Sequence, residues 1–333
     1  MIRFLSVLVL VFVFFGCSSK NIYKPKVIAG KATFNGSVVT PIVDVARDGA
    51  TLSDGRVITR KSGLVESGRL SKGFRYVSET DDAIVATNLF GDLYIISKQD
   101  FSVKNKLNFK TQILSATIKN NLLAMVDEKN DILVYDLGSA KLVYKEHLHD
   151  SVAVDSRLAN PLFVNDLVFF PTLDGRLLIY NINQKRVLRD IAISDDNIFN
   201  NVIYLQEHNG TIIGATRKKV ISITPSNIKN LRVGVKDVVY SGGQLYVFAK
   251  DGTILLLSDT LDKINELKLP NAVYSAVFAG NNYIYAVVKN GYLVEIAKDL
   301  SSYKVKELPD EVNSAVFGFN GKVYIGDKFI TLE

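Results

Sequence analysis

Few residues in this chain have the type and spacing that chemistry requires. His147 and His149 lie two positions apart in a strand-like run, so they would face one side and could hold a metal if carboxylates joined them. The plainer interpretation is a solvated pair at a sheet edge. Asp195 and Asp196 could act as paired acids for hydrolysis, but adjacent residues in an extended loop point apart. No nucleophile elbow, zinc-protease motif or phosphate-binding loop occurs, so we expect no catalytic residue, no bound metal and no cofactor.

The elements that would position any such residue are short hairpins. Two apolar runs at residues 167–170 and 177–180 flank a turn at Asp174-Gly175, and Asp-Gly tolerates the positive φ of tight hairpins. Neither run alternates between apolar and polar residues, so both faces of this small sheet must be covered. The simplest way to cover both faces is to pack further copies of the same hairpin against them.

Such copies recur about every 40 residues, with turn centres at positions 55, 91, 131, 175, 219, 252, 291 and 326. A period of this length with four strands in each unit is typical of β-propeller blades. One unit divides into residues 161–164, 167–170, 177–181 and 186–192. We predict an all-β, eight-bladed β-propeller of four-stranded antiparallel blades. Seven blades remain an alternative because the first unit, residues 38–64, is the least regular.

The last unit stops after three strands at Glu333. Residues 31–34 could supply its missing outer strand, which would close the ring and remove two open sheet edges. We therefore expect one propeller domain over residues 31–333.

The first residues have the pattern of an export signal. After Arg3, residues 4–15 form an unbroken apolar run that is short for a bilayer span but typical of a secretory signal. Gly16 then precedes Cys17, the single cysteine of the chain, and this resembles the lipobox of bacterial lipoproteins. The resemblance implies a signal peptide over residues 1–16, acylation (palmitate) of Cys17 and a tether over residues 17–30. An uncleaved anchor and a leader with an incidental cysteine are the alternatives.

The charge of the chain is mildly positive, with 40 Lys and Arg against 34 Asp and Glu and a formal net charge of +6. The excess is dispersed, and no basic stripe with interleaved aromatic residues is present. We expect no nucleic-acid partner.

The repeat resembles a known one. Residues 131–144, Asp-Ile-Leu-Val-Tyr-Asp-Leu-Gly-Ser-Ala-Lys-Leu-Val-Tyr, are similar to the quinoprotein-like (PQQ-like) propeller repeat. Tyr144 and Leu188 stand where that repeat places tryptophan, which this chain lacks. An exported eight-bladed chain of this kind resembles the BamB-like family of outer-membrane lipoproteins. The resemblance implies a lipid-anchored scaffold on the periplasmic face of the outer membrane, and Ser18 after the cysteine also implies that membrane.

The BamB-like resemblance also implies a partner site on two neighbouring loops. In that family one loop is apolar and carries arginine, and a loop of the next blade reads Ser-Asp-x-Asp. The corresponding residues here are Val152, Val154 and Arg157 in the loop 151–158, and Asp195 and Asp196 in the next unit. An exposed apolar pair beside an arginine suits a binding hot spot, and the two acids suit a basic partner segment. The alternative is that these residues only cover blade ends.

Together these patterns predict a non-catalytic scaffold. We expect it to bind a barrel-assembly protein of the BamA type and to assist outer-membrane protein insertion, as a monomer within a complex. One alternative is a propeller enzyme of the quinoprotein type, although the chain has neither tryptophan nor a second cysteine. The other is a surface-exposed lipoprotein that binds or adheres to host or matrix molecules.

Overall fold

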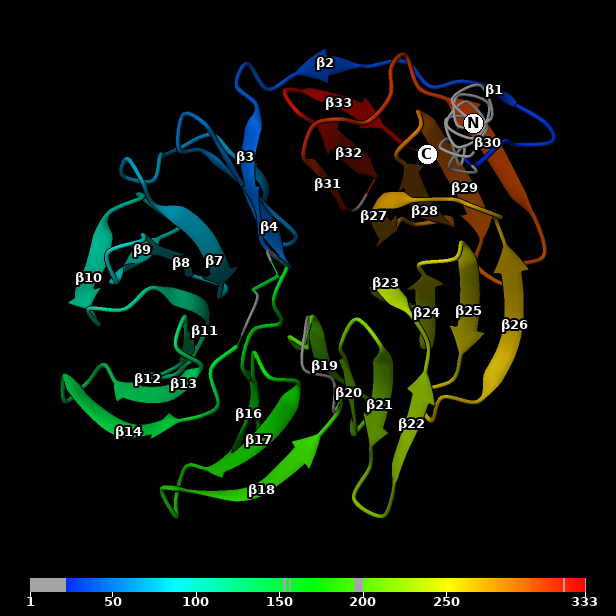
Figure 1. Cartoon of the computed structure of the whole chain (residues 1–333). Coiled ribbons are helices and arrows are strands. Elements are labelled where there is room, and N and C mark those ends of the chain that lie inside the picture. The colour runs from blue at the N-terminus through cyan, green and yellow to red at the C-terminus, as the bar shows by residue number, and fades with distance from the viewer. Residues whose placement is uncertain (1–21, 152–153, 156, 195–199, 320, 333) are drawn as a thin grey trace, which may run out of the picture.

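The computed structural model describes residues 22–151, 154–155, 157–194, 200–319 and 321–332. Cys17, Val152, Asp195 and Asp196 lie outside the described residues. The described residues form eight small sheets arranged in a ring, and we number these blades 1 to 8 in chain order (Figure 1). Within the described part of the chain, no helix is long and apolar enough to cross a membrane.

Each blade is a meander whose strands follow chain order from the inside of the ring to its rim. Blades 1 and 2 comprise β3 (Ile42–Val45), β4 (Gly49–Leu52), β5 (Val57–Thr59), β6 (Gly63–Val65), β7 (Arg75–Glu79), β8 (Ala83–Thr87), β9 (Asp92–Ser97) and β10 (Val103–Asn108). Blades 3 and 4 comprise β11 (Ile113–Lys119), β12 (Leu122–Asp127), β13 (Asp131–Asp136), β14 (Lys141–His147), β15 (Leu162–Val164), β16 (Leu167–Pro171), β17 (Arg176–Asn181) and β18 (Arg186–Ala192).

The second half of the ring repeats this order. Blades 5 and 6 comprise β19 (Tyr204–His208), β20 (Thr211–Ala215), β21 (Lys219–Ile223), β22 (Ile228–Arg232), β23 (Val235–Ser241), β24 (Gln244–Ala249), β25 (Thr253–Leu257) and β26 (Lys263–Lys268). Blades 7 and 8 comprise β27 (Tyr274–Ala279), β28 (Tyr283–Val288), β29 (Tyr292–Ala297), β30 (Tyr303–Glu307), β31 (Val316–Phe319), β32 (Lys322–Ile325) and β33 (Lys328–Thr331). The predicted eight-bladed propeller is confirmed, and the seven-bladed alternative is wrong.

The ring is closed by the N-terminal segment, but not at the residues that the sequence suggested. β2 (Gly36–Ser37) pairs with β33 and completes blade 8, whereas β1 (Gly30–Lys31) pairs in parallel with β30 as a fifth strand of blade 7. The expected closing strand at residues 31–34 is therefore wrong. Those residues pass from one blade to the next, where Ala32 and Phe34 pack into the core between blades 7 and 8.

The packed body also begins before Lys31, the expected start of the propeller domain. Tyr23 is 3% exposed in the core between blades 6 and 7, and its carbonyl accepts a hydrogen bond of 2.7 Å from Asn290 Nδ2. Residues 23–38 thus form a segment that ties blades 7 and 8 together, and we call it the strap.

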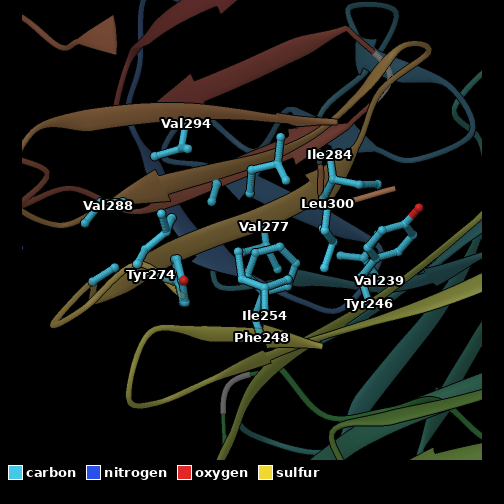
Figure 2. Packing of buried hydrophobic residues seen from close by; sticks show 14 of the residues in the cluster. Val239, Tyr246, Phe248, Ile254, Tyr274, Val277, Ile284, Val288, Val294 and Leu300 are labelled. Atoms are coloured by element: carbon cyan, nitrogen blue, oxygen red, sulfur yellow. The ribbon is translucent and has the colours of Figure 1, made fainter. Parts of the chain in front are cut away.

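The core is a series of apolar layers between neighbouring blades rather than one centre. Figure 2 shows the layer between blades 6 and 7, where the rings of Phe248 and Tyr274 meet edge to face at 5.1 Å. Every blade buries both faces this way, which explains why its inner strands read as unbroken apolar runs. Tyr144, at a position where the related repeat has tryptophan, packs against Tyr180 with ring centroids 4.6 Å apart.

The two ends of the ring differ in the loops that they carry. One end of the ring holds the turns between the second and third strands of each blade and the connections from blade to blade. We call this end the "turn face". The turns at Asp174-Gly175, Asp251-Gly252 and Asn290-Gly291 lie here, and Gly252 has a φ of +87°. A Cβ at Gly252 would also lie 2.0 Å from the Leu269 carbonyl oxygen of the next connection, so glycine is required for two reasons. The other end is called the opposite face.

Candidate functional site

The connection between blades 3 and 4, residues 148–161, enters the middle of the ring (Figure 1). Near its end the Asn160 side chain donates to the Val77 carbonyl at 3.4 Å and accepts from the Ala116 amide at 3.3 Å. These two backbone groups belong to the innermost strands of blades 2 and 3. We call this connection the plug because its side chains bridge blades across the channel.

Two arginines cross the channel and meet at one carboxylate, Asp237 of β23. Arg47 Nη1, from blade 1, lies 2.5 Å from Asp237 Oδ1, and Arg157 Nη1, from the plug, lies 3.3 Å from Asp237 Oδ2. Arg157 Nη2 also donates to the carbonyls of Ser275 and Val316, both at 3.2 Å. One plug side chain therefore joins the innermost strands of blades 6, 7 and 8.

The same cluster extends to blade 5 through a second carboxylate, Asp155, which belongs to the plug. Asp155 accepts from Arg217 Nε at 2.7 Å, and its amide donates to Asn201 Oδ1 at 2.6 Å. Arg217 also donates to the Lys236 carbonyl. Ser151 Oγ also donates to the Leu173 carbonyl of blade 4 at 3.2 Å, so hydrogen bonds from the described residues of the plug reach blades 2 to 8.

Electrostatics in the channel favour the charged form of Asp237. Burial alone would raise the pKa of this carboxyl, but the charges of Arg47 and Arg157 lower it to about 2. Burial lowers the pKa of Arg157 itself, and burial together with the nearby arginines lowers the pKa of Lys236. The channel therefore holds an excess of positive charge that Asp237 and Asp155 balance only in part.

A cavity of about 350 Å³ lies beside this cluster, between the innermost strands of blades 1 to 5. The charged side chains that line the cavity form ion pairs with each other or with neighbouring residues. Arg60 lies 3.2 Å from Asp48, and Glu79 lies 2.8 Å from Lys98. The cavity can accept a small polar molecule, but its charged groups already serve the fold.

The structure separates the residues expected to bind a partner. Val154 is 48% exposed, as an interaction residue should be. Arg157 instead turns into the channel, and its side chain is 22% exposed. Arg157 therefore does not share an exposed surface with Val154, because Asp237 and two carbonyls hold the guanidinium inside the ring. That either residue contacts a partner stays a prediction.

The histidines serve separate local contacts. His147 Nδ1 lies 2.6 Å from Asp131 on the neighbouring strand, while His149 Nδ1 lies 3.9 Å from Asp174 on the next blade. Among the residues that the structure describes, no group of three or more potential metal ligands gathers. His208 is half-buried and stacks on Tyr240 with ring centroids 3.4 Å apart, and its Nε2 lies 2.9 Å from the Tyr204 hydroxyl.

His208 predicts a pH dependence of stability. Burial lowers the pKa of His208 in the folded protein, so the unfolded chain takes up the proton first as the pH falls below about 6.5. We expect the melting temperature to decline from roughly pH 7.5 to pH 5.5 and this decline to flatten in His208→Gln. His149→Gln, at a side chain 92% exposed, is the matched control and should keep the wild-type slope. An identical slope in wild type and His208→Gln would contradict the assignment.

Asp237, Arg47 and Arg217 were not expected from the sequence. The sequence signal for Asp237 and Arg47 is a charged residue near one end of an innermost strand, whereas Arg217 lies in the turn between β20 and β21. Lys236 and Asp237 interrupt the apolar run from Val235 to Val239, and Arg47 follows the end of β3. Which of these charges meet across a ring cannot be read from a repeat of local hairpins.

Comparison with known proteins gives two kinds of likeness. Two curated relatives, both named plasminogen-binding protein PgbB, come from Helicobacter pylori strains J99 and 26695. The chain is 31% identical to the first in an alignment of 324 positions that covers 84% of this chain and 60% of the relative, and it is 32% identical to the second in an alignment of 323 positions. The chain thus spans about 60% of the length of the curated relatives that it matches. No protein-family model matches the chain.

Solved structures share the fold. BamB from Moraxella catarrhalis superposes with a TM-score of 0.67 at 11% identity, covering 87% of this chain and 96% of that one. Sqt1 from Saccharomyces cerevisiae superposes with a TM-score of 0.65 at 12% identity, covering 92% and 99%. At these identities the likeness establishes a BamB-like propeller fold.

Proposed function

We propose that this chain is a non-catalytic binding scaffold of the cell envelope and that plasminogen is the partner it fits best. The observation that carries the proposal is the 31% identity to the plasminogen-binding protein PgbB, which extends over 84% of the chain. The matched part includes most of the propeller, so binding by the shared part would place the partner site on this ring.

The geometry of the channel supports a non-catalytic role. Arg47, Arg157 and Asp237 occupy the middle of the ring, and each makes hydrogen bonds that tie blades together. Charged groups used in this way serve the fold, which leaves the faces and the rim of the ring to recognise a partner.

A second candidate is a scaffold for outer-membrane protein assembly with a partner of the BamA type. It rests on the fold shared with BamB and on the loops of blades 3 to 5 that resemble the BamB partner site in character. Val154 is the described residue of those loops that is available to a partner.

Envelope location is part of the proposal. The apolar run before Cys17 and the single cysteine support export and acylation, and Ser18 supports an outer-membrane destination. We propose attachment through Cys17, whose acyl chains would contribute about 0.8 kcal/mol per buried CH₂.

The test is binding by the full-length chain, purified in mild detergent, to plasminogen and separately to the periplasmic domain of the barrel-assembly protein. We expect the wild type to bind plasminogen and Val154→Glu to bind about tenfold more weakly, since a buried charge replaces an apolar contact. Ser226→Glu, at an exposed position on the opposite face, is the matched control and should bind as the wild type does.

Each outcome decides between the candidates. A chain that does not bind plasminogen refutes the first proposal and places the activity of the relatives in the part of them that this chain does not match. Binding to the barrel-assembly domain alone supports the second candidate. If plasminogen binds and Val154→Glu has no effect, the partner site lies away from the plug.

A further inference from the structure

Among the described loop residues, large apolar side chains are exposed on one face of the ring and not on the other. On the turn face they are Ile22, Val39, Leu89, Phe90, Val154 and Val273. In the described turns of the opposite face, no large hydrophobic residue is exposed. The other exposed ones lie on the rim strands, beside β1 or on β3. Five of the six on the turn face follow one arc over blades 7, 8, 1 and 2, and we call Ile22, Val39, Leu89, Phe90 and Val273 the apolar arc.

The apolar arc is most prominent at blade 2, where Leu89 is 71% exposed and Phe90 is 79% exposed. Their turn is held firmly, because the Asn88 side chain accepts from the Phe90 amide at 2.9 Å and from the Asp92 amide at 3.0 Å. Asn88 Nδ2 in turn donates to Asp92 at 2.8 Å. The fold therefore presents two apolar side chains to the outside on a rigid support, at a cost that monomeric proteins usually avoid.

Cations surround this tip. The exposed side chains of Arg69, Lys72, Lys110 and Lys129 lie on the turn face in the connections and turns of blades 1 to 3, and Glu66 and Glu128 are exposed acids of the same loops. Apolar tips flanked by lysine and arginine suit the boundary of a bilayer that contains anionic lipids.

The chain outside the described residues leaves the ring at the same face. Tyr23 is fixed at the turn of blade 7 by Asn290 and packs edge to face on Tyr292 at 5.8 Å. The six residue steps from Cys17 to Tyr23 span at most about 20 Å. The apolar run of residues 4–15 comes just before. Any membrane attachment at this terminus therefore keeps the turn face close to the bilayer.

We propose that the apolar arc docks on the surface of a bilayer that contains anionic lipids, with Leu89 and Phe90 inserted at the interface. A bilayer is the occupant that fits, because the arc is spread over loops of four blades on one face and the described chain begins beside it, at Ile22. Insertion of the arc would tilt the ring toward blades 7, 8, 1 and 2, so that the turn face near Val154, between blades 3 and 4, is raised from the lipid and remains open to a protein. The inference does not depend on which partner the propeller binds.

The chain contains no tryptophan, so a single tryptophan can report on the face that meets lipid. Phe90→Trp places the reporter in the apolar arc, and Ser226→Trp places a matched control in an exposed turn of the opposite face. The full-length variants are incorporated into vesicles of phosphatidylcholine with phosphatidylglycerol and into vesicles of phosphatidylcholine alone. Emission wavelength and quenching by iodide are measured, with circular dichroism as the check on folding.

With anionic vesicles we expect emission at position 90 to shift to shorter wavelength and its iodide quenching to fall by about half or more, while position 226 does not change. Adding Lys110→Gln and Lys129→Gln to Phe90→Trp should lower the ratio of protected to unprotected reporter in the anionic vesicles about fivefold per lysine. Equal quenching at positions 90 and 226 in vesicles would overturn the proposal. Protection of position 90 only after plasminogen or the barrel-assembly domain is added would assign the arc to that protein instead.

Discussion

Asp237→Asn is expected to lower the free energy of unfolding by about 3–5 kcal/mol. The substitution keeps the shape of the side chain but removes the charge that Arg47 and Arg157 share in the channel. Two guanidinium groups would then lie inside the ring without a compensating carboxylate, and the cost of burying each would no longer be offset. Chemical denaturation of wild type and variant measures the difference.

The control for Asp237→Asn is Glu266→Gln, which breaks an exposed pair with Lys263 on a rim strand. That change should cost no more than about 1 kcal/mol. Acid unfolding of the wild type provides an independent check. Because the pKa of Asp237 is lowered to about 2, its contribution to stability is full above about pH 4 and is lost as the pH falls toward 2. A variant as stable as the wild type would mean that the three side chains do not form one electrostatic unit.

Removal of residues 23–38, the strap, should cost about 3–6 kcal/mol and leave the ring open. Tyr23 and Val38 are each 3% exposed, and burial of a large apolar side chain contributes about 1.5–3 kcal/mol. The deletion also exposes the edges of β30 and β33, which invites pairing between molecules. Thermal melting and light scattering measure the two effects.

Two adjacent valines give a sharper form of the same experiment. Val38→Asp places a charge in the core between blades 8 and 1, whereas Val39→Asp changes a side chain that is 81% exposed. We expect the first to melt at a clearly lower temperature and the second to melt as the wild type does. If Val38→Asp, Val39→Asp and the strap deletion all melted at the wild-type temperature, closure by β2 would not contribute to stability.

The blade pattern was predictable because it is local. Each hairpin carries its own turn signal, as Asp174-Gly175 does, and its own unbroken apolar runs, so strands and their order follow from short stretches of sequence. Blade 4 shows this well, since β15 to β18 lie within a residue or two of the predicted segments. The number of blades followed from the period of the same signal.

Closure and the channel were less predictable because they depend on residues far apart in the chain. β2 is only Gly36–Ser37, too short to show a strand pattern, and its partner is β33 at the other terminus. Arg157 looked like a surface residue because its loop is irregular, yet it bonds to groups at positions 237, 275 and 316. Such contacts are set by the diameter of the ring rather than by any local motif.

Closure by the strap also orders the events of synthesis and export. The pairing of Gly36 with Phe329 joins residues from opposite ends of the chain, so the last blade cannot be completed until nearly every residue is available. Contacts so distant in sequence form slowly, because a loop of almost the full chain length must close first. A chain that crosses a membrane from its N-terminus would therefore remain without its final blade during passage, and the ring would close only after the last strand arrives on the far side.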